Sequence, residues 1–532
     1  MSPQPVEAGA AEASEAGATA PANPGGVLHR LFGRHLMDMA LLLVVIVAFS
    51  GLRQPSHLLA DPDIWWHLSD ARILFTTHHF IQVEPYSFTV AGEPWVNPEW
   101  LSEVPYWMGY RAFGLTGIFV VTYLSLSACV IFLYWRGRLM SRSAGVALWL
   151  AVLGFVLMWV NSSARTILLG YVALSAQMAI MEAAERGRKR LLWLLPPLFC
   201  VWINLHGSWI IGLAVFVLFI VCGLWRIEIG VFQQTAFNRE DRNGLFAVLG
   251  ASLAGLLINP YGWRLIWNPF DMALNQKLNI ANVLEWQPLS LGSFVGKAAV
   301  VAIGLMVIAN AVHGRKWKIF EMALVFFAWY SAFSHARFTF LAAVLVIPLL
   351  GVDVTRAFFP APEQEQKTIP AMNGVVAVLA LCVVAWYRPH EDKMRAGLAE
   401  EYPLQTIASI EPGWRLLNEE HLGGMLDYSG KPTFVDTRWD TFEHHGIMKD
   451  YIDLIRRRDS LAILDKYRID HVLMRYDDPF PYLLERTPGW KVVRIEGSGE
   501  DKYELFERVG AGQSSSAEAH TPTEPAAEPA HP

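Results

Sequence analysis

The segment Asp61-Pro62-Asp63-Ile64-Trp65-Trp66-His67 decides the interpretation of the fold, because it follows an apolar stretch at residues 36–52. A similar segment, Asn97-Pro98-Glu99-Trp100, comes shortly before the next apolar stretch. Acidic side chains are costly at the edge of a lipid bilayer, and in membrane proteins they mark functional sites. The two segments therefore predict chemistry at a membrane surface.

The composition is that of a membrane protein between two polar ends. Of the 532 residues, 53% are hydrophobic and 17% charged, whereas soluble domains carry about 25% charged residues. Residues 1–27 and 510–532 are rich in Ala, Pro, Gly and Glu, and both are expected to be disordered tails. The net charge of −6 argues against nucleic acid as a partner.

About eleven apolar segments between residues 28 and 388 are candidates for transmembrane helices, each of which needs about 20 residues. Lys and Arg gather in every second loop, so these loops are expected in the cytoplasm together with the N-terminus. The C-terminal part would then lie outside. The expected segments are residues 36–52, 115–135, 145–160, 166–183, 191–205, 208–225, 245–259, 296–312, 318–334, 338–353 and 371–387.

Residues 53–113 form the expected first outer loop, with two interfacial helices. Asp61 and Asn97 each precede a proline, so each is a candidate N-cap with proline as the first helical residue. Capping alone is an alternative explanation for these residues, because a helix dipole stabilises a carboxylate at its N-terminus by about 0.3–1 kcal/mol. His67 lies one turn after Asp63, so the pair could bind a divalent cation, Mg²⁺ or Mn²⁺, or share a hydrogen bond.

Four residues that carry or can take up a positive charge are expected on the same outer side: Arg165, His206, His335 and Arg337. Arginine suits a phosphate group because its planar guanidinium can bind two oxygens at once. The histidines would add hydrogen-bond donors. The alternative explanation is that the arginines reach the membrane interface only as anchors.

The composition of residues 389–509 is that of a soluble domain. Strands are predicted at residues 432–436 and 469–474 and a hairpin at 490–506, with helical residues at 446–467 between them. The predicted fold is thus mainly α, a polytopic helical bundle with a small extracytoplasmic α/β domain at its C-terminal end.

The phrases D-P-D-x-W-W-H-L and W-V-N-x-E-W-L-S-E, in the layout of residues 36–390, resemble the GT-C superfamily of membrane glycosyltransferases. The resemblance implies a multi-pass enzyme of the bacterial inner membrane. It would move a hexose or pentose from a polyprenyl-phosphate carrier to an extracytoplasmic glycan, lipid or protein. Many relatives have adjacent acids, whereas Pro62 separates them here, so either Asp61 or Asp63 would match the catalytic acid.

In the implied reaction an acceptor hydroxyl attacks the anomeric carbon of the sugar, and a lipid phosphate leaves. Asp61 or Asp63 is the expected base, and Glu99 would position the acceptor or support a metal. Arg165, Arg337, His206 and His335 would bind the lipid phosphate. A transporter or flippase for a lipid-linked saccharide is the main alternative, but the mostly clean apolar segments favour an enzyme. A non-catalytic membrane scaffold is a further alternative.

Overall fold

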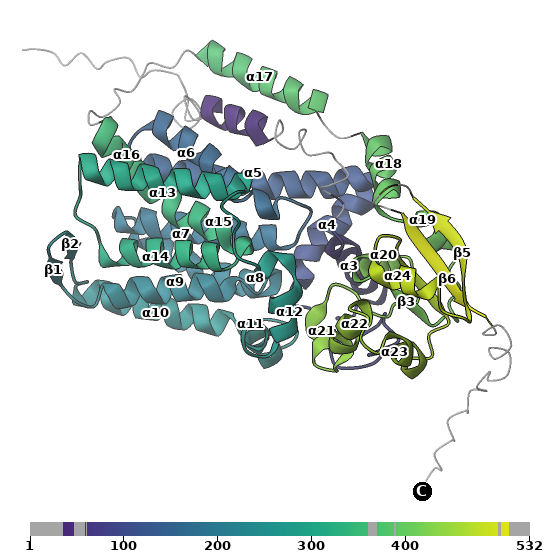
Figure 1. Cartoon of the computed structure of the whole chain (residues 1–532). Helices are drawn as coiled ribbons and strands as arrows, with labels where there is room; N and C mark the ends of the chain where they lie inside the picture. The colour runs from purple at the N-terminus through teal and green to yellow at the C-terminus, as the bar shows by residue number, and fades with distance from the viewer. Residues whose placement is uncertain are drawn as a thin grey trace, which may run out of the picture.

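In a computed structural model of the protein, residues 36–46, 59, 61–359, 370–387, 390–497, 499 and 502–509 are described. The expected tails at 1–27 and 510–532, and parts of the first apolar segment and the first outer loop, lie outside these residues. The chain forms a long helical bundle and a smaller C-terminal lobe that contains a sheet (Figure 1). Helices α3 (Asp63–Thr77) and α4 (Trp100–Phe113) lie between the two (Figure 1).

Each expected apolar segment falls largely on a helix of the bundle, but the helices differ in length. Among the described residues, four helices are long and apolar enough to cross a membrane: α5, α7, α13 and the continuous stretch Ala336–Phe358. The bundle helices are Leu36–Ile46, α5 (Leu115–Ser141), α6 (Ala144–Leu157), α7 (Ile167–Glu185), α8 (Leu195–Leu205), α9 (Trp209–Cys222), α10 (Arg239–Gly255), α13 (Phe294–Val312), α14 (Ile319–Ser334), α15 (Thr339–Leu341), α16 (Ile347–Phe358) and α17 (Pro370–Tyr387).

The sequence predicts about eleven transmembrane segments, but some of the corresponding helices are too short to cross the bilayer. Helix α8 has 11 residues, which at 1.5 Å per residue is about 16 Å, roughly half the thickness of the hydrocarbon layer. It ends at His206, whose extended backbone breaks the helix before α9 begins at Trp209. The chain is a membrane protein in which α8 packs into the core of the bundle beside the long helices, whereas α17 is largely exposed.

The two helices of the expected outer loop begin slightly later than the sequence predicts. Helix α3 begins at Asp63, and α4 begins at Trp100. In each case the residue before the proline forms a short turn: Asp61 accepts a hydrogen bond from the backbone of Asp63 (3.2 Å), and Asn97 accepts one from Glu99 (2.9 Å). This side-chain turn is a common alternative to direct capping.

The C-terminal lobe is built around a four-stranded sheet with strand order β3-β4-β6-β5. Strands β3 and β4 are parallel, and β6 pairs antiparallel with β4 and β5, so the hairpin predicted at 490–506 is present. The elements of the lobe are α18 (Glu391–Glu401), α19 (Leu404–Ser409), β3 (Leu416–Asn418), α20 (Glu420–Tyr428), α21 (Trp439–Glu443), α22 (Ile447–Ile455), α23 (Ser460–Lys466), β4 (His471–Arg475), α24 (Pro479–Leu484), β5 (Trp490–Glu496) and β6 (Tyr503–Arg508).

The strand predicted at residues 432–436 is wrong. This segment makes only an isolated bridge, from Thr433 to Ser87. The carbonyl oxygen of Thr433 accepts a hydrogen bond from the backbone of Phe88 (3.2 Å), so the segment pairs with the loop between α3 and α4 and not with the sheet. The apolar residues of this segment are buried, but they are buried against the α3–α4 loop and not as part of the sheet.

Helix α20 of the lobe packs directly on the start of α3. A methyl group added to Gly424 would lie 2.3 Å from the carbonyl oxygen of Pro62, which is backbone and cannot move aside. We therefore expect Gly424→Ala to lower the free energy of unfolding by about 1–3 kcal/mol and to reduce activity, because it pushes the lobe away from Asp63. Thermal unfolding in detergent would measure the first effect.

Gly413→Ala is the matched control for this substitution. Gly413 lies on the surface of the same lobe, with nothing within 4 Å of an added methyl group. Equal unfolding temperatures for Gly424→Ala and Gly413→Ala would show that the contact between α20 and α3 is looser than described.

Candidate active site

Asp61 lies at the centre of a buried cluster between the bundle and α3. Its carboxylate forms an ion pair with Arg165 and accepts a hydrogen bond from the Ser163 hydroxyl (2.8 Å). Arg165 also pairs with Glu285, which belongs to the short helix η3 (Leu284–Trp286). Asp61 therefore binds a cation in addition to the backbone at the start of α3. A residue that only caps the helix would need the backbone contact alone.

Asp63 stands beside this cluster but is not part of its ion pairs. Its side chain is partly exposed, and among the described residues no basic group forms a salt bridge with it. Desolvation by the surrounding protein and the negative charge of Asp61 raise the pKa of Asp63 to about 6, while Arg165 opposes the rise. Asp63 is therefore a carboxylate that can gain and lose a proton near neutral pH.

Glu99 faces the same space from the start of α4. It accepts a hydrogen bond from the Thr166 hydroxyl, and its carboxylate oxygens lie 3.3 Å from Nε2 of His206 and 3.5 Å from Nε2 of His67. Burial raises the pKa of Glu99 to about 7; the Thr166 hydrogen bond opposes this rise, and the charge of Asp63 adds to it. The two acids therefore influence each other's protonation.

His67 does not join Asp63 in a pair of metal ligands. Its Nδ1 lies 2.9 Å from Glu103, and its Nε2 lies 3.2 Å from the hydroxyl of Thr166, so both ring nitrogens face protein groups. Burial lowers the pKa of His67, which keeps the ring neutral. Across the part of the chain that the structure describes, no group of three or more His, Cys, Asp or Glu side chains is arranged to hold a metal ion.

Arg337 lies next to the site on the short helix η4 (Ala336–Phe338). Its guanidinium stacks on the ring of Trp286 at 4.3 Å, and within the described ranges it has no acidic partner. Its positive charge acts to lower the pKa of Glu99 and the pKa of His206. Arg337 is thus a cation whose charge is not neutralised by an ion pair.

The two remaining histidines have different surroundings. His206 accepts a hydrogen bond from the backbone of Ser208 (2.9 Å), and burial followed by the charge of Arg337 lowers its pKa to about 3, so the ring is neutral beside Glu99. His335 is bonded through Nδ1 to the carbonyl oxygen of Trp286, and so supports the ring on which Arg337 stacks. His335 shapes the site without facing its acids.

The fold is also found among solved structures. The oligosaccharyltransferase of Archaeoglobus fulgidus, tethered to an acceptor peptide containing the NVT sequon, aligns with a TM-score of 0.51 at 8% identity over 84% of this chain and 70% of that chain. This chain has the GT-C fold. ArnT from Cupriavidus metallidurans, bound to undecaprenyl phosphate, aligns with a TM-score of 0.47 at 14% identity over 91% of this chain and 99% of that chain. No family model and no curated protein matches the sequence.

The GT-C fold brings further residues to the site that the sequence did not predict. Besides Glu285, two of them come from the C-terminal lobe. Glu420 accepts a hydrogen bond from the indole of Trp439, and burial raises its pKa to about 7, with the charge of Asp63 contributing. The hydroxyl of Thr437 lowers the pKa of Asp63. Neither Glu420 nor Thr437 was among the site residues predicted from the sequence, because the sequence does not show which distant segments meet.

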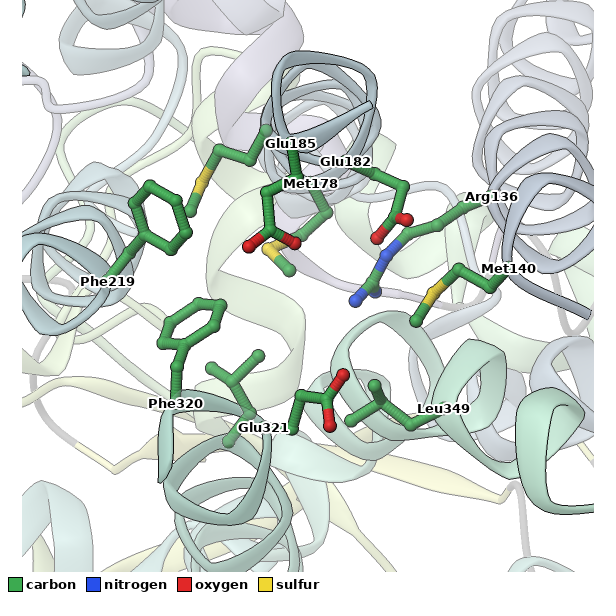
Figure 2. A pocket seen from close by; sticks show the side chains of 11 residues that line it. Arg136, Met140, Met178, Glu182, Glu185, Phe219, Phe320, Glu321 and Leu349 are labelled. Atoms are coloured by element: carbon green, nitrogen blue, oxygen red, sulfur yellow. The ribbon is translucent and has the colours of Figure 1, made fainter. Parts of the chain in front are cut away.

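A small pocket of about 20 Å³ lies at the opposite end of the GT-C bundle (Figure 2). Helix α7 has 19 residues and so spans about 28 Å between the two ends. The pocket has room for roughly one water molecule and surrounds the side chain of Arg136 (Figure 2). Its glutamates already have basic partners, in the pairs Glu182–Arg186, Glu185–Lys318 and Glu321–Arg315. The pocket is therefore separate from the candidate active site.

Proposed function

We propose that the protein is a membrane glycosyltransferase that moves a sugar from a polyprenyl-phosphate carrier to an acceptor outside the cytoplasm. One observation carries the proposal: Asp63 and Glu99 lie at the same end of the bundle as Arg337, a cation that forms no ion pair within the described part of the chain. A carboxylate that can accept a proton and a free guanidinium are the two groups that such a transfer needs. The GT-C fold supports this reading by analogy.

We assign the base to Asp63 and a supporting role to Asp61. The acceptor hydroxyl gives its proton to Asp63 as its oxygen bonds to the anomeric carbon. The bond from that carbon to the phosphate oxygen breaks, and the lipid phosphate leaves as an anion that needs no proton. Asp61 is occupied by Arg165 and Ser163, so its part is to hold Arg165 in place.

The leaving phosphate would be bound by Arg337 and further stabilised by the positive charge of Arg165. Fixed cations near a developing negative charge are worth most in a site that excludes water. His206 and Glu99 would orient the acceptor, since they lie 3.3 Å apart and can hold a hydroxyl group between them. Both ring nitrogens of His67 lie within hydrogen-bond distance of Glu103 or Thr166, so we assign His67 a structural role and Asp63 the role of base.

The orientation and location in the cell belong to the same proposal. The end of the bundle opposite the site is rich in basic residues, which favours the cytoplasmic side for that end. The site, α3, α4 and the C-terminal lobe would then face the outer side of a bacterial inner membrane. The basic residues at the opposite end are Arg136, Arg138, Arg186, Lys189, Arg315 and Lys318.

The test is a transfer assay in proteoliposomes. The donors are undecaprenyl-phosphate-linked hexoses and pentoses, and the acceptors are a mixture of cell-envelope glycans, lipids and proteins. We expect protein-dependent release of undecaprenyl phosphate and labelling of one acceptor class. Movement of an intact donor between leaflets, with no release of phosphate, would support the transporter alternative and overturn the enzyme.

The pH dependence of turnover follows from the pKa of Asp63. The base must be ionised, so kcat is expected to fall as the pH is lowered through about 6, well above the range in which an ordinary aspartate takes up a proton. The measurement is kcat between about pH 5 and 8, with the unfolding temperature recorded at each pH to exclude denaturation. A flat profile over this range would show that Asp63 does not act as the base.

A further inference from the structure

Arg438 is a buried arginine that joins the C-terminal lobe to the loop between α3 and α4. Its guanidinium binds both carboxylate oxygens of Glu84, at 2.7 and 3.0 Å. It also binds Asp436 of its own lobe, with Nε 3.0 Å from Oδ1. Three aromatic rings surround the charge: Trp66 at 5.7 Å, Tyr86 at 5.1 Å and Trp95 at 4.8 Å.

This junction does not have the properties of a simple stabilising contact. A buried ion pair commonly adds little net stability compared with apolar residues of the same size, so its presence is consistent with a geometric role. The planar guanidinium makes two parallel hydrogen bonds to Glu84, and these fix both the distance and the relative orientation of the two side chains. Arg438 therefore fixes how residues 436–440 of the lobe lie against the α3–α4 loop.

The residue next to Arg438 reaches the proposed catalytic acid. The hydroxyl oxygen of Thr437 accepts a hydrogen bond from the indole of Trp66 (3.2 Å). Trp66 lies three residues after Asp63 on α3, so the two side chains share one side of the helix, and the bond from the Trp66 indole holds the Thr437 hydroxyl on that side. Because its oxygen accepts from Trp66, the hydroxyl keeps its own hydrogen to donate, and its presence acts to lower the pKa of Asp63. The guanidinium of Arg438 also lies over the ring of Trp66, so Arg438 contacts the residue to which the Thr437 hydroxyl is hydrogen-bonded.

We propose that Arg438 is a positioning residue, which holds Thr437 so that its hydroxyl donates a hydrogen bond to Asp63. The proposal rests on the proposed transfer reaction, in which Asp63 receives the proton of the acceptor. Arg438 touches no reacting atom. Its effect on the reaction passes entirely through Thr437.

A double-mutant cycle tests this order of action. Thr437→Val removes the hydroxyl at nearly constant volume, and Arg438→Lys keeps the charge but loses the two-point contact with Glu84. Each variant is expected to lower kcat by roughly tenfold or more, the loss that follows when one hydrogen bond to a charged group is removed. The KM for the donor should change little. The double variant should be no worse than Thr437→Val alone, and multiplied losses would overturn the proposal.

Arg315→Lys is the matched control for Arg438→Lys. Arg315 is also a buried arginine that binds two acids, Asp353 and Glu321, but it lies at the opposite end of the bundle. Both lysine variants are expected to lower the unfolding temperature, and only Arg438→Lys should lower kcat. If Arg315→Lys and Arg438→Lys lowered kcat equally, Arg438 would be a residue that only stabilises the fold.

A labelling experiment tests the positioning without any sugar donor. In a full-length chain whose four native cysteines are replaced by alanine, Thr437→Cys is exposed to a membrane-impermeant maleimide, with and without Arg438→Lys. Faster labelling in the presence of Arg438→Lys is expected, because the segment is released from Glu84. Equal rates would overturn the proposal. Faster labelling in a protein that consumes no lipid-linked sugar would leave the positioning intact and refute the proposed function instead.

Discussion

Asp63→Asn is expected to lower kcat by roughly 10²–10⁴-fold, the range that a positioned proton acceptor contributes. The substitution keeps the size and shape of the side chain but removes its capacity to take up the acceptor's proton. Asp63 forms no salt bridge among the described residues, so the fold should tolerate the change. Binding of undecaprenyl phosphate should be unchanged or tighter, because one negative charge leaves the neighbourhood of the phosphate. The transfer assay and a direct binding measurement separate the two effects.

Asp61→Asn is the comparison that distinguishes the two acids. Asp61 is paired with Arg165, so its loss leaves a partly buried guanidinium with Glu285 as its one remaining acidic partner among the described residues. We expect a lower unfolding temperature and weaker donor binding, with a smaller fall in kcat than for Asp63→Asn. The opposite order of kcat values, at unchanged stability, would transfer the role of base to Asp61.

Arg337→Met is expected to weaken the binding of undecaprenyl phosphate by about 10- to 150-fold, which corresponds to the loss of about 1.5–3 kcal/mol from hydrogen bonds to a charged group. Arg337 has no ion pair among the described residues, so its removal leaves no carboxylate without a partner. The unfolding temperature should therefore change little. Isothermal titration or a flotation assay with labelled undecaprenyl phosphate would measure the affinity.

Arg356→Met serves as the control for Arg337→Met. Arg356 is exposed and lies near the other end of the same helical stretch, Ala336–Phe358. Its substitution should leave the affinity for the lipid phosphate unchanged. Similar losses in the two variants would mean that the arginines act only through the general attraction of the protein for anionic lipid.

Much of the site could be predicted from the sequence because the unusual polar residues were expected on one side of the membrane. Acidic and basic side chains at one end of a bundle tend to form ion pairs with one another, so a contact between Asp61 and Arg165 could be expected. The structure brings these two residues together in an ion pair. The sequence could not tell which acid would take the arginine. That choice depends on where α3 begins, and a shift of one residue rotates a side chain by about 100° around a helix.

The residues that the sequence missed share a physical reason. Glu285, Thr437 and Glu420 act through contacts between segments far apart in the chain, and no periodic pattern records such contacts. The segment 432–436 was mistaken for a strand for the same reason, because its buried residues face the α3–α4 loop. The local pattern of apolar residues predicts which face of a helix or strand is buried, but it does not predict which distant segment packs against that face.

The contact of Thr437 in the C-terminal lobe with Trp66 of α3 has a consequence for how the protein is made. Ribosomes deliver the chain from its N-terminus, and domains fold as they emerge, so the acids of α3 enter the membrane long before Thr437 and Glu420 are synthesised. In the proposed reaction, the nascent protein would therefore have a complete site only after the lobe has been synthesised and has folded onto α3. Partly synthesised chains would then not consume lipid carrier.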